Sequence, residues 1–268
     1  MSFFELRRPT TTERPLLVEV PHAGLAIPEI VSGDVKAPAD GVLRDADIYM
    51  DDISAGAPSA GGSLLTAKVS RYVVDLNRAA DDVDAATVPD HPRPRASQPR
   101  GVVWRIGTDG KSVLRKPLTY VELKERLALF HEPYHAALQA ELIRMREMFG
   151  YAILIAAHSM PSVGRVAHGD PGAIRADVVP GTRGRTSADG RVIDLVDAHF
   201  RAAGLRVRHD DPYRGGFTTG FYGRPSEHWH AVQIELNRAL YVDEENKSYE
   251  CIGDWFEAHG NRLQYAAN

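Results

Sequence analysis

Short apolar runs alternate along this chain with longer stretches of helical periodicity. The runs are rich in Val, Ile, Leu and Ala, they are too short for helices, and Pro, Gly or polar residues interrupt the sequence near them, which favours buried strands. The strands predicted in this way are residues 16–20, 63–76, 151–157, 205–208 and 230–236.

Between these runs, apolar positions three or four residues apart predict helices. The predicted helices are residues 42–53, 118–148, 192–203 and 249–265. Pro133 interrupts the second helix, Gly150 fits its C-cap and Gly204 stops the third. Residues 83–101 and 159–190 lack periodicity and are expected to be long loops of the kind that often carries function.

Strands and helices alternate throughout, which is typical of an α/β fold with a central sheet covered on both faces. Neither a repeat of domain size nor a linker is visible, so a single domain over residues 1–268 is expected.

Composition limits the possible functions of the protein. A net charge of -4, with 25% charged residues and no strongly basic half, argues against a nucleic-acid scaffold.

No apolar run is long enough to cross a bilayer, and the first 15 residues do not resemble a signal peptide. The single cysteine, Cys251, excludes an internal disulfide and a CxxC metal site. A protein located in the cytoplasm, without membrane or nucleic-acid partners, is therefore expected.

Two nearly repeated phrases suggest where the chemistry lies. Residues 74–79 read VDLNRA and residues 234–239 read IELNRA, each at the end of an apolar, β-branched run. Ligands of open α/β sheets bind at the carboxyl ends of strands, so an acid, an amide and a guanidinium group in that position indicate a functional site.

Histidines stand at two further predicted strand ends. His22 follows residues 16–20, and His158 follows residues 151–157. Either one alone is explained by a hydrogen bond to a carbonyl group, but two imidazoles at one sheet edge, with acids nearby, favour a metal site. Asp47, from the acidic cluster at residues 45–52, is the preferred third ligand, with Glu29 a weaker alternative.

Glu235 alternates with apolar neighbours, so Gln233, Glu235 and Asn237 should share one face of their strand. A glutamate there suits a general base that takes a proton from a metal-activated water. An ion pair between Glu235 and Arg238 or Arg78 is the alternative.

Residues 131–135, HEPYH, formally match the HExxH motif of zinc peptidases. That motif requires both histidines on one uninterrupted helical face, whereas Pro133 costs roughly 3 kcal/mol within a helix. His131 and His135 are therefore expected to pack near the site rather than to bind the metal.

Arginines crowd the predicted rim of the site, and guanidinium groups recognise carboxylates through paired hydrogen bonds. Arg71 and Arg78 flank one predicted strand, and Arg214 lies in the glycine-containing segment PYRGGF. This arrangement indicates a small anionic substrate.

At this level of detail the chain resembles the N-formylglutamate amidohydrolase family. The similar segments are VEVPHAG at 18–24, DADIYMDD at 45–52, SRYVVDLNR at 70–78, FHEPYH at 130–135, AAHSMPS around His158, DPYRGGFTT at 211–219 and AVQIELNRALYVDE at 231–244. The resemblance implies hydrolysis of N-formyl-L-glutamate to formate and glutamate in histidine breakdown.

A more distant resemblance, to zinc carboxypeptidases and aspartoacylases, implies a phosphorylase/hydrolase-like, three-layer α/β/α fold with a central mixed sheet. It further implies zinc (or another divalent metal such as cobalt) held by His22 and His158, Glu235 as base, Arg71 at the scissile carbonyl, and Asn77 with Arg78 on a substrate carboxylate. Arg214 is expected to assist binding. Those relatives have a glutamate three residues after the first histidine; Leu25 stands there in this chain, so Asp47 is assigned as the third ligand.

The resulting hypothesis is metal-dependent hydrolysis of an N-acyl, above all N-formyl, amino acid. Two alternatives stay open. One is a deacylase or carboxypeptidase-like hydrolase that acts on a different N-acyl amino acid, and the other is a non-catalytic protein that binds anionic small molecules. The sequence does not determine the oligomeric state.

Overall fold

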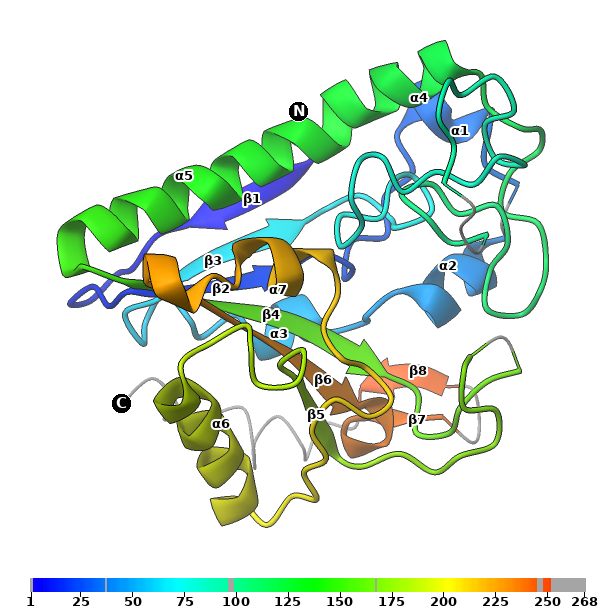
Figure 1. Cartoon of the computed structure of the whole chain (residues 1–268). Helices are drawn as coiled ribbons and strands as arrows, with labels where there is room; N and C mark the ends of the chain where they lie inside the picture. The colour runs from blue at the N-terminus through cyan, green and yellow to red at the C-terminus, as the bar shows by residue number, and fades with distance from the viewer. Residues whose placement is uncertain (1, 37, 96–98, 167, 245–247, 252–268) are drawn as a thin grey trace.

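A central mixed sheet of six strands organises the molecule (Figure 1). The structure, a computed structural model, describes residues 2–36, 38–95, 99–166, 168–244 and 248–251. The strand order is β1-β3-β2-β4-β6-β5, and β7 and β8 form a separate pair. The strands are β1 (Phe4–Arg7), β2 (Leu16–Val20), β3 (Ser63–Ala67), β4 (Ala152–Met160), β5 (Val178–Gly181), β6 (Trp229–Asn237), β7 (Val242–Asp243) and β8 (Ser248–Cys251).

The helices are short, except for two. Those of the described residues are α1 (Glu29–Ser32), α2 (Ala39–Asp45), α3 (Met50–Ile53), α4 (Tyr120–Arg126), the π-helix η1 (Leu127–His131), α5 (Glu132–Phe149), α6 (Gly190–Ala202), α7 (Phe217–Tyr222), and the 3-10 helices η2 (Pro225–Glu227) and η3 (Arg238–Leu240). A capping box at Thr119 and Glu122 begins α4, and Gly150, with φ of 82°, ends α5.

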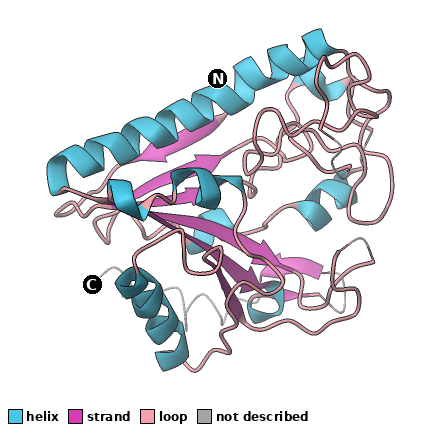
Figure 2. Ribbon diagram, viewed as in Figure 1, coloured by secondary structure: helices cyan, strands magenta, loops and turns pink. Residues whose placement is uncertain are grey.

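Helices cover both faces of the sheet, which gives three layers (Figures 1 and 2). On one face, Tyr134, Leu138 and Leu142 of α5 pack into a core cluster with apolar residues of β2, β3 and β4. On the other face, Ile53 of α3 and Ile193 of α6 belong to a second cluster with residues of β2, β5 and β6. The predicted three-layer α/β/α fold is confirmed.

The four inner strands run parallel, whereas β1 and β5 are antiparallel to their neighbours at the two edges. The carboxyl ends of β2, β4 and β6 consequently meet at one edge of the sheet. In the β4–β6 register, His158 lies opposite Glu235, and β2 ends two residues before His22. Polar groups from separate parts of the chain thereby reach one place.

Three of the predicted strands correspond to β2, β4 and β6, within three residues at each end. The prediction for residues 63–76 is wrong beyond Ala67: the chain then makes turns, so the VDLNRA phrase does not end a strand. The predicted strand at 205–208 is also wrong, because only an isolated bridge joins Val207 to Val178. Strand β5 was missed, since its four residues lie inside a segment rich in Gly, Pro and Arg.

The predicted helix at residues 42–53 is two helices, α2 and α3, with a turn between them that carries Asp47. Asp47 and Asp51 therefore do not share a helix face. At the other end of the chain, Ser248–Cys251 form a strand rather than the start of the predicted helix 249–265, whose remainder lies outside the described residues. Among the described residues no helix is both long and apolar enough to cross a membrane.

Candidate metal and substrate site

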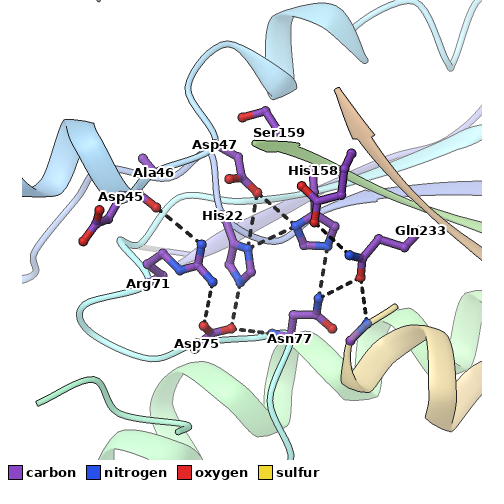
Figure 3. Close-up of polar contacts among 12 residues, drawn as sticks. His22, Asp45, Ala46, Asp47, Arg71, Asp75, Asn77, His158, Ser159 and Gln233 are labelled. Carbon is purple, nitrogen blue, oxygen red and sulfur yellow. Dashed lines mark hydrogen bonds and ion pairs between the residues drawn. The ribbon is translucent and has the colours of Figure 1, made fainter. Parts of the chain in front are cut away.

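Three side chains from separate segments converge at the carboxyl edge of the parallel strands (Figure 3). His22 follows β2, Asp47 lies between α2 and α3, and His158 belongs to β4; all three are buried. The Nδ1 atoms of the two histidines are 3.2 Å apart, and Oδ2 of Asp47 lies 3.4 Å from Nδ1 of His22 and 2.9 Å from Nδ1 of His158. The structure thus brings together the three residues predicted as ligands.

This triangle suits a tetrahedral ion. At tetrahedral angles, bonds of 2.0–2.2 Å from zinc to nitrogen or oxygen put neighbouring ligand atoms roughly 3.3–3.6 Å apart. The edges of 3.2 and 3.4 Å are close to this spacing, and the third edge, at 2.9 Å, is shorter because a hydrogen bond joins its two atoms. Two imidazole nitrogens and one carboxylate oxygen are donors typical of catalytic zinc sites, in which a fourth position stays open for water or substrate. The residues present therefore fit a divalent metal.

Asp75 fixes the orientation of His22. Its Oδ1 lies 2.7 Å from Nε2 of His22, so this nitrogen carries the proton and Nδ1 presents its lone pair to the triangle. Oδ2 of Asp75 accepts hydrogen bonds from Arg71, at 2.8 Å, and from the indole nitrogen of Trp104, at 2.9 Å. The carboxylate that the sequence marked only as part of a repeated phrase is the support of a candidate ligand.

Asn77 performs the corresponding role for His158. Its Nδ2 lies 3.1 Å from Nε2 of His158, while its Oδ1 accepts from the backbone N–H and hydroxyl of Thr218. With the amide held in this direction, Nε2 of His158 accepts and its Nδ1 donates to Asp47. Metal binding at Nδ1 would transfer that proton to Nε2 and require the amide of Asn77 to present its oxygen instead.

Gln233 links this network to Glu235. Its Nε2 donates to Oε1 of Glu235 at 2.8 Å, and its Oε1 accepts from the backbone N–H of Gly216 and from Nδ2 of Asn77. Gln233 and Glu235 thus share a face of β6, as the alternation predicted, while Ile234 belongs to the core on the opposite side. Glu235 is 6% exposed and lies beside the triangle, opposite His158 on the neighbouring strand.

Burial and neighbouring charges separate the pKa values of the acids. Burial raises the pKa of Glu235 to about 7; His158 opposes this shift and the charge of Asp47 adds to it. Burial opposes the ionisation of Asp47 as well, but the hydrogen bond from His158 and the proximity of His22 hold its pKa well below the usual range. For Asp75, His22 and Arg71 likewise outweigh burial, so its pKa is also low. Such a separation is what acid–base chemistry requires.

Arg238 braces the turn that carries Asp47. It is 3% exposed and donates to the carbonyl oxygens of Arg44 and Ala46, to the hydroxyl of Ser159 and, at 3.4 Å, to Oδ1 of Asp47. The predicted alternative, an ion pair of Glu235 with Arg238 or Arg78, is not among the contacts of the described residues.

A cavity of about 730 Å³ opens beside the triangle, and Asp47, Arg71 and Arg78 are among the residues that line it. A second cavity, of about 620 Å³, lies next to it and shares Asn77 and Arg78 with the site. Arg78 is about one-third exposed, and its ion pair with Asp82 is loose, at 3.6 Å. Arg214 is exposed and lines neither cavity, so its binding role stays a prediction.

The HEPYH segment supports the site from behind. Nε2 of His131 contacts the carbonyl oxygen of Arg78 at 2.9 Å, and Nε2 of His135 contacts that of Leu76 at 3.0 Å. Pro133 is tolerated because it stands in the first turn of α5, directly after the π-helix η1. The expectation that these histidines pack near the site is confirmed.

Sequence reasoning missed three members of the network: Asp75 as partner of His22, Trp104 as partner of Asp75, and Gln233 as the link to Glu235. Asp75 and Gln233 carry a usable signal, because each is a polar residue in an apolar run next to an assigned site residue. Trp104 lies outside every element and loop predicted from the sequence, so only the folded chain shows its contact.

Comparisons with known proteins identify a family that the chain matches over most of its length. A family model for N-formylglutamate amidohydrolase matches residues 14–242. An N-formylglutamate deformylase of Pseudomonas putida is 33% identical over 233 residues, which is 86% of this chain and 82% of that protein. An N-formylglutamate deformylase of Pseudomonas aeruginosa is 33% identical over 235 residues, 86% of this chain and 83% of that protein.

Among solved structures, the crystal structure of N-formylglutamate amidohydrolase from Ralstonia eutropha JMP134 is similar, with a TM-score of 0.88 and 27% sequence identity. The similarity covers 100% of this chain and 96% of that one. A gene product of Agrobacterium tumefaciens shares the fold, with a TM-score of 0.64 at 17% identity over 100% and 94% of the two chains.

Proposed function

The chain belongs to the N-formylglutamate amidohydrolase family, and from this premise we propose that it is a metal-dependent enzyme that hydrolyses N-formyl-L-glutamate to formate and L-glutamate. The observation that carries the proposal is the convergence of His22, Asp47 and His158 beside an arginine-lined cavity. The two deformylase relatives support the substrate.

His22, Asp47 and His158 would hold the metal, for which zinc is proposed and cobalt is an alternative. A bound divalent ion lowers the pKa of water toward about 7 and polarises a carbonyl oxygen. Asp75 and Asn77 keep the two imidazole rings in place, and burial of all three ligands keeps competing water away from them.

Glu235 is proposed as the general base. It takes a proton from the attacking water as the water oxygen bonds to the formyl carbon, and it returns this proton to the amide nitrogen as the C–N bond breaks. A pKa of about 7 suits a group that must accept and then release a proton near neutral pH. Arg71, oriented by Asp75 and stacked 4.3 Å from the centre of the Trp104 ring, is proposed to stabilise the developing negative charge on the carbonyl oxygen.

Arg78 is proposed to hold a carboxylate of the glutamate part, because it lines the cavity and its ion pair with Asp82 is loose. Asn77 was predicted to share this role, and Arg214 to assist it. The Asn77 amide contacts Nε2 of His158 in this structure, and it would still contact that atom with its oxygen if a metal were bound at Nδ1, so the proposed role of Asn77 is chiefly to position His158.

Activity on N-formyl-L-glutamate before and after chelation tests the proposal. Formate release should stop when the metal is removed, and zinc or cobalt should restore it. Full activity in protein shown by elemental analysis to be free of metal would overturn the metal dependence.

The Glu235→Gln variant separates the base from a ligand. It should lower kcat by roughly 100- to 10,000-fold while metal content stays at the wild-type level. Loss of metal from this variant would instead make Glu235 a ligand.

A panel of N-formyl, N-acetyl and N-succinyl amino acids distinguishes the proposed deformylase from a deacylase with another substrate. Tight dicarboxylate binding without turnover of any of them, in protein free of metal, would favour a non-catalytic binding protein. Participation in histidine breakdown and a cytoplasmic location belong to the same proposal and rest on the family resemblance.

A further inference from the structure

Gln233 is a buried amide whose two ends have different partners (Figure 3). Its Oε1 accepts from the backbone N–H of Gly216 at 2.8 Å, and its Nε2 donates to Oε1 of Glu235, also at 2.8 Å. Only 4% of the Gln233 surface is exposed. This side chain therefore connects the residue proposed as the general base to the main chain at the start of α7.

The backbone N–H of Gly216 determines which way the Gln233 amide points. A backbone N–H group can only donate a hydrogen bond, so the atom of Gln233 that faces it must be the oxygen. The NH2 group is then directed at Glu235. The direction of this hydrogen bond follows from the main chain, and it does not depend on which nitrogen of a nearby histidine carries a proton.

The position of Glu235 explains why its carboxylate needs such a partner. The side chain is flexible and only 6% exposed, so water contributes little to holding it in place. Its backbone is fixed, because Glu235 lies opposite His158 in the β4–β6 register. The hydrogen bond from Gln233 then selects one orientation of the carboxylate relative to His158, and it supplies a donor that an ionised, buried carboxylate requires.

We propose that Gln233 is a positioning residue of the hydrolytic reaction, which holds the Glu235 carboxylate in the orientation that takes a proton from the attacking water. This inference rests on the proposed function and adds to it the residue that orients the base. Strand geometry suits the role, since residues two apart on a strand point to the same face and lie about 7 Å apart along it. A glutamine side chain can bridge that distance, as the bond to Glu235 shows.

Gln233→Met tests this role, because methionine has a similar length and cannot donate a hydrogen bond to Glu235. In the metal-loaded protein, kcat for N-formyl-L-glutamate should fall roughly 10- to 100-fold, as expected for the loss of one hydrogen bond to a charged group. KM and metal content should stay within about threefold of the wild-type values. Gln139→Met makes the same substitution at an exposed position of α5 and should keep the wild-type kcat. An unchanged kcat in Gln233→Met would overturn the proposal.

Gln233→Glu separates the bond to Glu235 from the bond to Gly216, and it remains informative if Gln233→Met does not fold. The new side chain keeps an oxygen that can accept from Gly216 and loses the amide donor to Glu235. Its carboxyl group either repels Glu235 or shares a proton with it, and both weaken the base. The value of kcat should therefore fall at least as far as in Gln233→Met, and a wild-type kcat would contradict the proposal.

A Glu235→Gln background shows whether Gln233 acts through Glu235. Adding Gln233→Met to this variant should lower the remaining rate by less than about threefold, because the partner through which Gln233 acts is already absent. A purely structural role would lower the rate by the same factor in both backgrounds, and that result would refute the positioning role.

If the wild-type protein does not hydrolyse N-formyl-L-glutamate, the proposed function fails, and crystal structures still decide the role of Gln233. A Glu235 side chain that contacts Gln233 in the wild-type protein and adopts a different rotamer in Gln233→Met or Gln233→Glu supports it. A Glu235 side chain that does not contact Gln233 in the wild-type protein, or that keeps its rotamer in the variants, contradicts it.

Discussion

Asn77 and His158 are 81 positions apart in the sequence, yet the side-chain amide of Asn77 contacts Nε2 of His158 at 3.1 Å. Thr218 and Gln233 hold the other atoms of this amide. The orientation of a candidate metal ligand therefore depends on a turn after β3, on α7 and on β6 together.

Gly216 should be essential to this arrangement. A Cβ atom at this position would lie 2.3–2.6 Å from three atoms of the Asn77 amide, far inside contact distance. Gly216→Ala should displace Asn77, loosen His158 and reduce both metal affinity and turnover by at least about tenfold, the range found when a partner of a metal ligand is lost.

Gly33→Ala provides the control, because a Cβ at Gly33 meets nothing within 4 Å and its φ is -63°. It should leave metal affinity and turnover unchanged. Metal titrations of Gly216→Ala and Gly33→Ala that coincide would show that the contact with Asn77 does not matter.

Asp47 and Asp51 should differ in metal binding, although both belong to one acidic cluster in the sequence. Asp47 lies in the triangle, whereas Asp51 lies in α3 and outside the metal-binding group. Asp47→Asn should lower zinc affinity by roughly 100-fold or more, because an amide is a much weaker ligand than a carboxylate. Asp51→Asn should bind zinc with the wild-type affinity. Competition with a chelating dye measures both constants, and similar affinities in the two variants would remove Asp47 from the ligand set.

Substitutions of Arg238 and Arg78 should affect stability and substrate binding differently, although both arginines stand in a Leu-Asn-Arg-Ala phrase. The Arg238 side chain is 3% exposed and holds the Asp47 turn, so Arg238→Met should lower the free energy of unfolding by roughly 3–5 kcal/mol. The Arg78 side chain is 32% exposed, so Arg78→Met should cost less than about 1 kcal/mol and act mainly by raising KM. Chemical denaturation and steady-state kinetics on both variants check this, and equal destabilisation would refute it.

His135 should make the fold sensitive to acid. Burial lowers its pKa to about 3, with the neighbouring His131 adding to the shift. The unfolded chain binds a proton at this residue near pH 6.5 and the folded chain does not, so stability is lost as pH falls below 6.5. At pH 5 the loss due to His135 is about 2 kcal/mol relative to pH 8.

The His135→Gln variant isolates this effect. Its free energy of unfolding, measured by denaturant titration at pH 8 and pH 5, should fall less between the two values than that of the wild-type protein. The same pH dependence in both proteins would mean that His135 is not the group responsible.

The fold was predictable where local sequence and tertiary environment agree. Strand β2 has the predicted bounds because its apolar residues are flanked by prolines, and α5 ends at Gly150 because glycine adopts the left-handed conformation at little cost. Strand β5 was not predictable, because pairing with β6 gives strand structure to residues whose composition is typical of a loop.

For the site, the sequence by itself determined the chemistry: two histidines at strand ends, an acidic cluster, a glutamate in an alternating strand and a surplus of arginines. Residue type determines which groups can bind a metal, move a proton or attract an anion. The positions of these groups at the ends of predicted strands determine which of them can come together at one edge of the sheet. Only the tertiary structure decided that Asp47 alone of its cluster reaches His22 and His158, and that Arg238 is buried against the Asp47 turn while about one third of the Arg78 side chain stays exposed. Those choices depend on how turns pack over the sheet edge, and such long-range contacts leave no periodic signal in the chain.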